Sequence, residues 1–232
     1  RALQGMRNGG LKRGFGSWFA YADERVYTPP DALLPDYLHL TGILGLERVV
    51  FVQPSIYGAD NSVMLSAMRK CPLEHRAVAV VGPDVTDIEL DTLHTAGVRG
   101  LRFNLVDVAD ASTELPLDPI RRLAARISPL GWHVELLVHV DYHPNFDELL
   151  GDLEVEVVVG HLGYFAPGRT VDDEGFRALL RLMQTERCWA KLSGPYRVSA
   201  GDLPYANTQE FAQQLVQTAP DRVIWGSDWP HV

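Results

Sequence analysis

Seven short apolar runs that alternate with helical patterns predict an α/β fold, a (β/α)8 barrel of the TIM type that is incomplete at its first strand and its last helix. Several of the runs are continuous stretches of Val, Ile and Leu, which is typical of strands buried on both faces of a parallel sheet. Because each run is preceded by its own helical pattern, a barrel built from βα units fits better than an open sheet.

The elements follow one another in a regular order. Helix boundaries are marked by Asp, Asn or Pro at the starts and by Gly or Pro at several ends. The predicted strands lie at 48–55, 76–83, 98–106, 133–140, 155–163, 187–194 and 222–228. The predicted helices lie at 30–45, 59–71, 84–97, 117–131, 145–153, 173–184 and 207–219.

The two ends of the chain lack an element each. The missing first strand is expected near 12–21, but this stretch has two glycines, two basic residues and no β-branched residue, so it is a poor strand. We therefore expect residues 1–20 to be largely irregular. A helix is expected after the last strand, yet the sequence stops at Val232. No linker or low-complexity tract divides the chain, so residues 1–232 are predicted to form a single barrel domain.

Composition excludes several classes of function. The chain is 46% hydrophobic and 22% charged, as in ordinary soluble globular proteins, and its net charge of −9 disfavours nucleic acid and anionic membranes as partners. No apolar run approaches the roughly 20 residues of a membrane helix. Cys71 and Cys188 adjoin different predicted strands, which favours free thiols and a cytoplasmic location. The expected partner is a small molecule, and the sequence leaves the oligomeric state open.

Polar side chains gather at the carboxyl ends of six predicted strands, where the active sites of such barrels lie. This is more than turn chemistry requires, and it predicts one convergent polar site. The residues concerned are Gln53, Ser55, Tyr57, Arg102, Asn104, His139, Asp141, His161, Tyr164, Lys191, Ser193, Tyr196, Arg197, Asp228 and His231.

Each of these residues also has a structural interpretation. His161 follows a wholly apolar strand, which favours a place in the site over a structural role. Asp228 could be a catalytic residue or a turn residue that caps its own backbone. Arg102 would be costly to bury unpaired, so it needs either a carboxylate partner or an anionic ligand. Lys191 could be a reactive amine, although a structural ion pair is the commoner role.

Five ordered motifs carry a family resemblance: "VQPSIYGADN", "GVRGLRFNLV", "VVVGHLG", "KLSGPYR" and "VIWGSDWPH". With them the chain resembles the amidohydrolase-2 branch of the amidohydrolase superfamily, and it is most similar to lactonases of the 2-pyrone-4,6-dicarboxylate hydrolase type. The resemblance runs from about Tyr21 to the C-terminus. It implies a (β/α)8 barrel that hydrolyses a lactone or a related ester or amide.

The resemblance also implies roles for individual residues. Asp228 matches the aspartate that activates water, and His161 matches the histidine that polarises the carbonyl group. Ser55, Arg102 and Arg197 match residues that hold substrate carboxylates, and His231 is a flanking candidate. We expect Asp228, His161, Arg102 and Arg197 to converge on one pocket at the carboxyl ends of the strands.

Two departures from the family pattern affect metal and substrate. Relatives carry first-strand histidines, whereas the corresponding stretch 9–15 has none, so we expect neither metal nor cofactor. Three residues after His161, relatives often have an arginine, and here Tyr164 takes that substrate-binding position. Two alternatives stay open: a metal-dependent decarboxylase of the same superfamily, and a non-catalytic remnant that binds a carboxylate.

Overall fold

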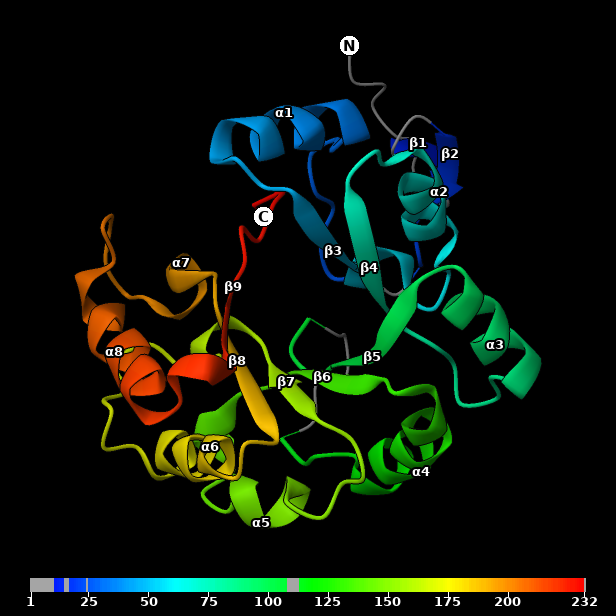
Figure 1. The fold of residues 1–232 in the computed structure, drawn as a ribbon. Helices are drawn as coiled ribbons and strands as arrows, with labels where there is room; N and C mark the ends of the chain where they lie inside the picture. The colour runs from blue at the N-terminus through cyan, green and yellow to red at the C-terminus, as the bar shows by residue number, and fades with distance from the viewer. Residues whose placement is uncertain (1–10, 15–16, 24, 108–112, 232) are drawn as a thin grey trace. The chain divides into compact units, whose positions relative to one another are not determined.

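Seven parallel strands carry the fold (Figure 1). The computed structural model describes residues 11–14, 17–23, 25–107 and 113–231. Hydrogen bonding joins the strands in sequence order: β3 (Arg48–Val52), β4 (Glu74–Ala79), β5 (Val98–Asn104), β6 (His133–Leu137), β7 (Val157–Val159), β8 (Cys188–Leu192) and β9 (Val223–Trp225). Each strand overlaps one of the predicted runs, so the α/β class and the seven parallel strands are confirmed. Closure of these strands into a barrel stays a prediction.

The chain forms two compact units, which we describe separately. Unit 1 comprises Arg1–Arg102, Asp107–Asp110 and Trp229–Val232, and unit 2 comprises Phe103–Val106 and Ala111–Asp228. Strand β5 contributes its last two residues to unit 2. That the whole chain is a single barrel domain stays a prediction.

Unit 1 begins with a pair of short strands that the sequence analysis does not anticipate. β1 (Leu11–Gly14) pairs antiparallel with β2 (Ser17–Ala20) in a two-stranded sheet of their own. Part of the stretch expected to be irregular is therefore regular, while residues 1–10 lie outside the described residues. The aromatic residues Trp18 and Phe19 have high strand propensity, which offsets the lack of β-branched residues. The pair does not supply the first barrel strand, because it does not join the parallel sheet.

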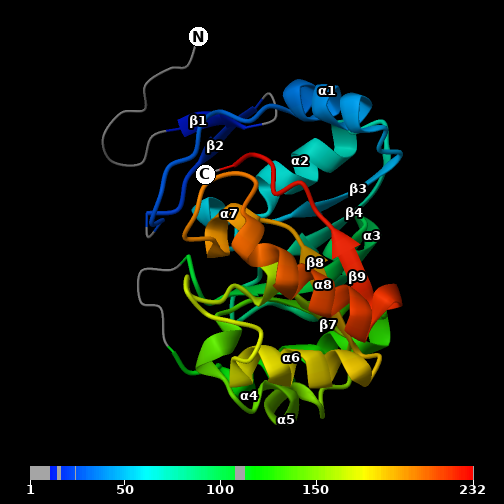
Figure 2. The same cartoon turned by 90° about the vertical axis from the view of Figure 1, so that its left-hand side faces the viewer.

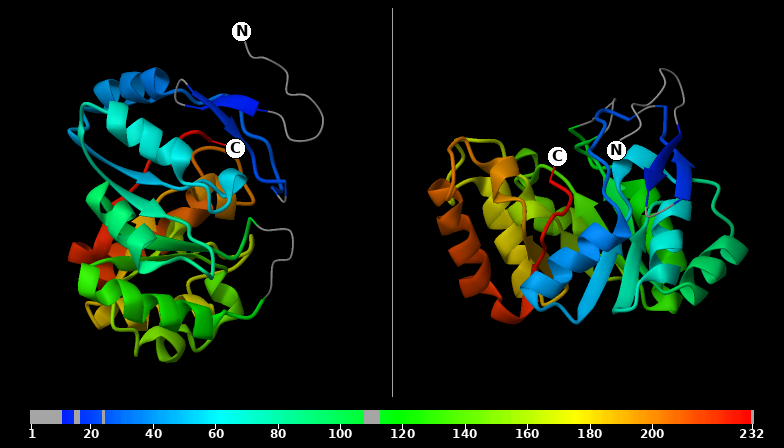
Figure 3. Two further views of the ribbon diagram at one scale, coloured as in Figure 1. Left: turned by 90° about the vertical axis from the view of Figure 1, so that its right-hand side faces the viewer. Right: turned by 90° about the horizontal axis from the view of Figure 1, so that it is seen from above.

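Three helices complete unit 1: α1 (Leu34–Leu44), α2 (Ser62–Lys70) and α3 (Asp87–Thr95). Helix α2 packs on β3 and β4 (Figure 3) and buries Val63, Met64 and Ala67. Helix α3 starts with a capping box, in which the Thr86 hydroxyl accepts from the Glu89 amide at 3.2 Å and the Glu89 carboxylate accepts from the Thr86 amide at 2.7 Å.

Unit 2 contains the strands β6 to β9 and the helices that follow β5 in the chain. These are α4 (Leu117–Ile127), α5 (Phe146–Leu150), α6 (Glu174–Gln184), the short α7 (Pro195–Val198) and α8 (Gln209–Thr218). Helices α4 and α6 pack on β6 and β8, and α6 also contacts α5 and α8 (Figure 2). The strand residues on this side are buried: Val134, Leu136, Val157, Val159, Cys188 and Ala190.

The helices predicted from the sequence are confirmed, because α1 to α6 and α8 each overlap one of them. Helix α7 was not predicted. Pro195 opens α7, as proline commonly does at a first helical position, although the sequence patterns predict no helix there. Helix α7 packs against the turn formed by His161–Gly163 at the end of β7. No helix in the described part of the chain is long and apolar enough to cross a membrane.

Candidate active site

Asp228 lies at the centre of a polar cluster in unit 2. Its Oδ2 accepts hydrogen bonds from the Tyr196 hydroxyl at 2.6 Å and from Arg197 Nε at 2.7 Å. Its Oδ1 is 3.6 Å from His161 Nε2, and the Asp228 side chain is only 17% exposed. Residues that follow β7, β8 and β9 are thus brought together, and the expectation that His161, Arg197 and Asp228 lie near one another agrees with this geometry.

The charge state of Asp228 follows from these neighbours. Burial opposes ionisation of the carboxyl group, but the charge of His161 and the hydrogen bonds from Tyr196 and Arg197 outweigh it, so the pKa of Asp228 is lowered. Burial, together with the nearby Asp228 carboxylate, raises the pKa of Tyr196. At neutral pH Asp228 is therefore a carboxylate and Tyr196 keeps the proton that it donates.

His161 is engaged at both ring nitrogens. Its Nδ1 is 3.0 Å from the Ser193 hydroxyl, while Nε2 faces Asp228. The ring also lies so close to Gly194 that a Cβ there would be 2.7 Å from Nδ1. Gly194 has φ +59°, a left-handed conformation that favours glycine. The sequence "LSG" after β8 therefore fixes the orientation of the imidazole from two sides.

The backbone around this cluster is strained. His161 has φ 48°, Leu162 φ 61°, Tyr164 φ 48° and Asp228 φ 54°, all in the left-handed region. Such conformations cost non-glycine residues roughly 1 kcal/mol or more each, and they concentrate at functional sites. The strain places the side chains at the ends of β7 and β9 where the cluster needs them.

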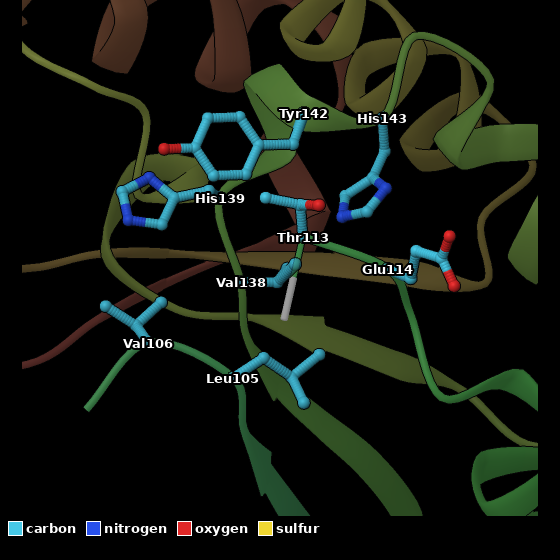
Figure 4. A pocket seen from close by; sticks show the side chains of 8 residues that line it. All are labelled: Leu105, Val106, Thr113, Glu114, Val138, His139, Tyr142 and His143. Atoms are coloured by element: carbon cyan, nitrogen blue, oxygen red, sulfur yellow. The ribbon is translucent and has the colours of Figure 1, made fainter. Parts of the chain in front are cut away.

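Tyr164 connects the cluster to a second group of residues after β6. Its ring centroid is 5.9 Å from that of His161 and 5.0 Å from that of His139. His139 stacks on Tyr142 with 4.9 Å between centroids. Asp141 has a fully buried side chain and accepts a hydrogen bond from Arg169 Nε at 2.9 Å. A pocket of about 210 Å³ opens beside His139 (Figure 4).

The other two predicted substrate-binding residues belong to unit 1. Arg102 donates from Nη1 to the Gln53 carbonyl at 3.1 Å, and its Nε is buried without a partner among the described residues. The Ser55 hydroxyl donates to the Tyr27 hydroxyl at 3.3 Å. The convergence of Arg102 and Ser55 with Asp228 stays a prediction, as does the flanking role of His231.

Sequence reasoning left the roles of three residues undefined. Tyr196 and Ser193 appear among the polar strand ends without a role, and Tyr27 is not singled out. The motif "SGPYR" signals the first two, because Tyr196 immediately precedes the predicted Arg197. Lys191 forms an ion pair with the buried Glu135, which agrees with the structural interpretation of this lysine.

The side chains near Asp228 do not suit a metal ion. Within the described part of the chain, no three His, Cys, Asp or Glu side chains are grouped so that they could hold one. Asp228 Oδ2 is bonded to the cationic Arg197, which competes for the position a cation would take. His161 Nδ1 is directed to Ser193.

Polar side chains gathered at the carboxyl ends of parallel strands are typical of the active sites of α/β enzymes. The chain belongs to the amidohydrolase family, whose model matches residues 9–232. The prediction of a hydrolase related to the amidohydrolases is confirmed.

Comparisons with individual proteins agree. The chain is 38% identical over 227 residues to a 2-pyrone-4,6-dicarboxylate hydrolase of Comamonas testosteroni, covering 94% of this chain and 74% of that protein. It is 36% identical over 213 residues to a 4-sulfomuconolactone hydrolase of Hydrogenophaga intermedia, covering 92% and 70%. The crystal structure of a Pseudomonas putida protein described as a 2-pyrone-4,6-dicarboxylic acid hydrolase matches this chain with a TM-score of 0.79 at 35% identity. The match covers 90% of this chain and 77% of that one.

Proposed function

We propose that this protein hydrolyses the lactone ring of a small carboxylate-bearing molecule, with Asp228 as the general base. The observation that carries the proposal is the geometry of Asp228, whose Oδ2 is bonded to Tyr196 and Arg197 while Oδ1 faces His161. The names of two relatives, a pyrone dicarboxylate hydrolase and a sulfomuconolactone hydrolase, support a lactone as the substrate.

The geometry suits activation of a water molecule. With Oδ2 occupied by two donors, Oδ1 is the oxygen with acceptor capacity, and its 3.6 Å separation from His161 Nε2 is longer than a normal hydrogen bond. A water molecule beside Oδ1 gives its proton to Asp228 as its oxygen bonds to the lactone carbonyl carbon. Negative charge then develops on the carbonyl oxygen, where His161 acts as hydrogen-bond donor.

Collapse of this intermediate completes the reaction. The bond between the carbonyl carbon and the ring oxygen breaks, and the proton held by Asp228 passes to that oxygen. The net change is the addition of one water molecule, which turns the lactone into a carboxylic acid and a hydroxyl group, and the acid then releases its proton to the solvent as a carboxylate. Asp228 returns to its ionised form, which the hydrogen bonds from Tyr196 and Arg197 favour.

The remaining predicted residues orient the substrate. Arg197 bonds Asp228 through Nε, so its terminal nitrogens serve a substrate carboxylate. Tyr164, beside His161, forms one wall for the ring. Closure of the parallel strands into a (β/α)8 barrel would bring Arg102 and Ser55 to the same end as Asp228. The buried, unpartnered Nε of Arg102 supports a role in holding an anionic group.

The test is Asp228→Asn, assayed by ring opening of 2-pyrone-4,6-dicarboxylate and of muconolactones. Asparagine keeps the shape and removes the base, so we expect kcat to fall by about a thousandfold with unchanged circular dichroism. Asp221→Asn, at an exposed position, is the matched control. A variant at position 228 that keeps most of its turnover would show that another group is the base. Substrate binding without turnover by the unmodified protein would instead support the carboxylate-binding remnant.

A further inference from the structure

We infer that the pocket beside β6 binds an uncharged, hydroxyl-bearing arm of the substrate, so that this enzyme favours lactones with one carboxylate over lactones with two. The inference rests on the proposed function, because it concerns the substrate of the same site. It is carried by the position of the pocket, by the charge of its walls and by the hydrogen-bonding groups that it offers.

The pocket is large enough for a substituent of the lactone ring. Its volume of about 210 Å³ compares with roughly 30 Å³ for one water molecule in the liquid. Apolar side chains and polar rings share its surface, and in Figure 4 Leu105 and Val106 lie across the pocket from Tyr142. It is lined by Leu105, Val106, Thr113, Glu114, Val138, His139, Tyr142 and His143.

The pocket adjoins the catalytic cluster through Tyr164. That ring lies near both His161, at 5.9 Å between centroids, and His139, at 5.0 Å. Because His139 is both a neighbour of Tyr164 and a wall of the pocket, a ring held at His161 can extend an arm past Tyr164 into it. All of these residues belong to unit 2.

The walls of the pocket disfavour a second carboxylate. None of its eight described lining residues is arginine or lysine, and Glu114 contributes a carboxylate. Burial lowers the pKa of His143, with Asp141 opposing and His139 adding to this effect, so His143 is neutral at neutral pH. The nearby Arg169 is committed to Asp141 and Asp173. A carboxylate arm would therefore meet a like charge, and no arginine or lysine stands among the described lining residues to bind it.

Hydroxyl groups suit the same walls. Thr113 and Tyr142 offer hydroxyls that donate and accept, and Glu114 offers acceptor oxygens. His139 Nδ1 and Asp141 Oδ1 are buried 3.7 Å apart, each without a hydrogen-bond partner among the described residues. A proton on Nδ1 would face Asp141 and leave Nε2 as an acceptor, which also matches a hydroxyl donor.

The experiment compares three pyrones that differ only in one arm. They are 2-pyrone-4,6-dicarboxylate and the two compounds in which a hydroxymethyl group replaces either the 4- or the 6-carboxylate. We expect kcat/KM for one hydroxymethyl compound to exceed that for the dicarboxylate at least about tenfold. Glu114→Gln should shrink this ratio, and the exposed Glu210→Gln should leave it unchanged. A preference for the dicarboxylate, or a ratio unaffected by Glu114→Gln, would overturn the inference.

Calorimetric binding of the same compounds to Asp228→Asn separates this inference from the proposed function. Tighter binding of a hydroxymethyl compound supports the pocket assignment whatever the turnover. If the unmodified enzyme then hydrolyses none of the three, the proposed function fails while the assignment of the pocket stands. Equal or tighter binding of the dicarboxylate overturns the assignment.

Discussion

The Asp228 cluster of unit 2 and the Arg102–Gln53 pair of unit 1 hold their polar side chains in different ways. In unit 2, Asp228 is bonded by Tyr196 and Arg197 and faces His161, so side chains satisfy one another. In unit 1, Arg102 donates to the main-chain oxygen of Gln53, while Arg102 Nε and Gln53 Oε1 are buried without partners among the described residues. The Asp228 carboxylate has its hydrogen-bond donors in place, whereas the Arg102–Gln53 pair keeps polar atoms without partners.

This difference separates chemistry from recognition. A network whose charges already balance is pre-organised, and it needs no ligand to hold its geometry. A buried donor that lacks a partner costs about 1–3 kcal/mol, which a ligand can recover on binding. We therefore expect changes at the Asp228 cluster to lower kcat and changes at Arg102 to raise KM.

The largest effect after that of Asp228→Asn should follow from Gly194→Ala. A methyl group there would be 2.7 Å from His161 Nδ1 and 3.2 Å from Arg197 Cδ, on a backbone with φ +59°. Both neighbours of Asp228 would be displaced, and misplacement by about 1 Å can cost roughly a hundredfold in rate. We expect kcat to fall by at least about that factor, with a smaller change in KM, measured by steady-state kinetics.

Gly201→Ala is the control for this substitution. A Cβ at Gly201 would meet nothing closer than Ser199 Oγ at 3.8 Å, which is ordinary contact. Its kinetics should match those of the unmodified enzyme. Normal kcat in the Gly194→Ala variant would show that the close approach of Gly194 to His161 has no catalytic importance.

The next largest effect concerns unit 1. Arg102→Met removes the guanidinium while keeping much of its apolar length, so a substrate carboxylate loses a charge-assisted hydrogen bond. We expect KM for carboxylate-bearing lactones to rise about 10- to 100-fold with a lesser change in kcat. The exposed Arg69→Met serves as control. A fall in kcat alone would contradict the division between the two regions.

The sequence predicts the parallel strands well because their burial is a local property of the chain. Runs such as 155–163 and 187–194 are apolar enough to identify without a partner, and β7 and β8 lie within them. The strands β1 and β2 were not predicted because neither contains a long apolar run. Trp18 and Phe19 of β2 form a strand by pairing with β1, and the sequence pattern does not reveal this partner.

The site was predictable in its residue types but not in its pairing. Asp228, His161 and Arg197 stand out as polar residues directly after strands, as well as through the family motifs. The sequence does not show that Arg197 bonds Asp228 as well as a ligand. This contact depends on the three-dimensional structure and on α7, which was not predicted. Ser193 and Tyr196 gain their roles in the same way.

A smaller effect should distinguish the donors to Asp228. Tyr196→Phe removes one hydrogen bond that favours the carboxylate, so the pKa of Asp228 should rise from its lowered value. A general base must be unprotonated, and activity is lost as the pH falls through its pKa. The acid limb of kcat/KM should therefore move to higher pH, by about one unit or less. The pH profile measures this, and an unmoved or downward-shifted limb would remove Asp228 as the titrating base.

The smallest expected effect is that of a chelator. Residues 9–15, where the family resemblance leads us to expect first-strand histidines, contain none. Of the remaining candidates, Asp228 is bonded to Arg197, and Tyr164 lies near both His139 and His161. A catalytic zinc site usually needs three protein ligands at about 2.0–2.2 Å, which this arrangement does not provide.

Elemental analysis should find no stoichiometric divalent metal in the purified protein, and EDTA should leave kcat unchanged. One zinc or manganese ion per chain, with activity lost on its removal, would mean that the Asp228 cluster is not complete in itself and would restore the metal-dependent alternative.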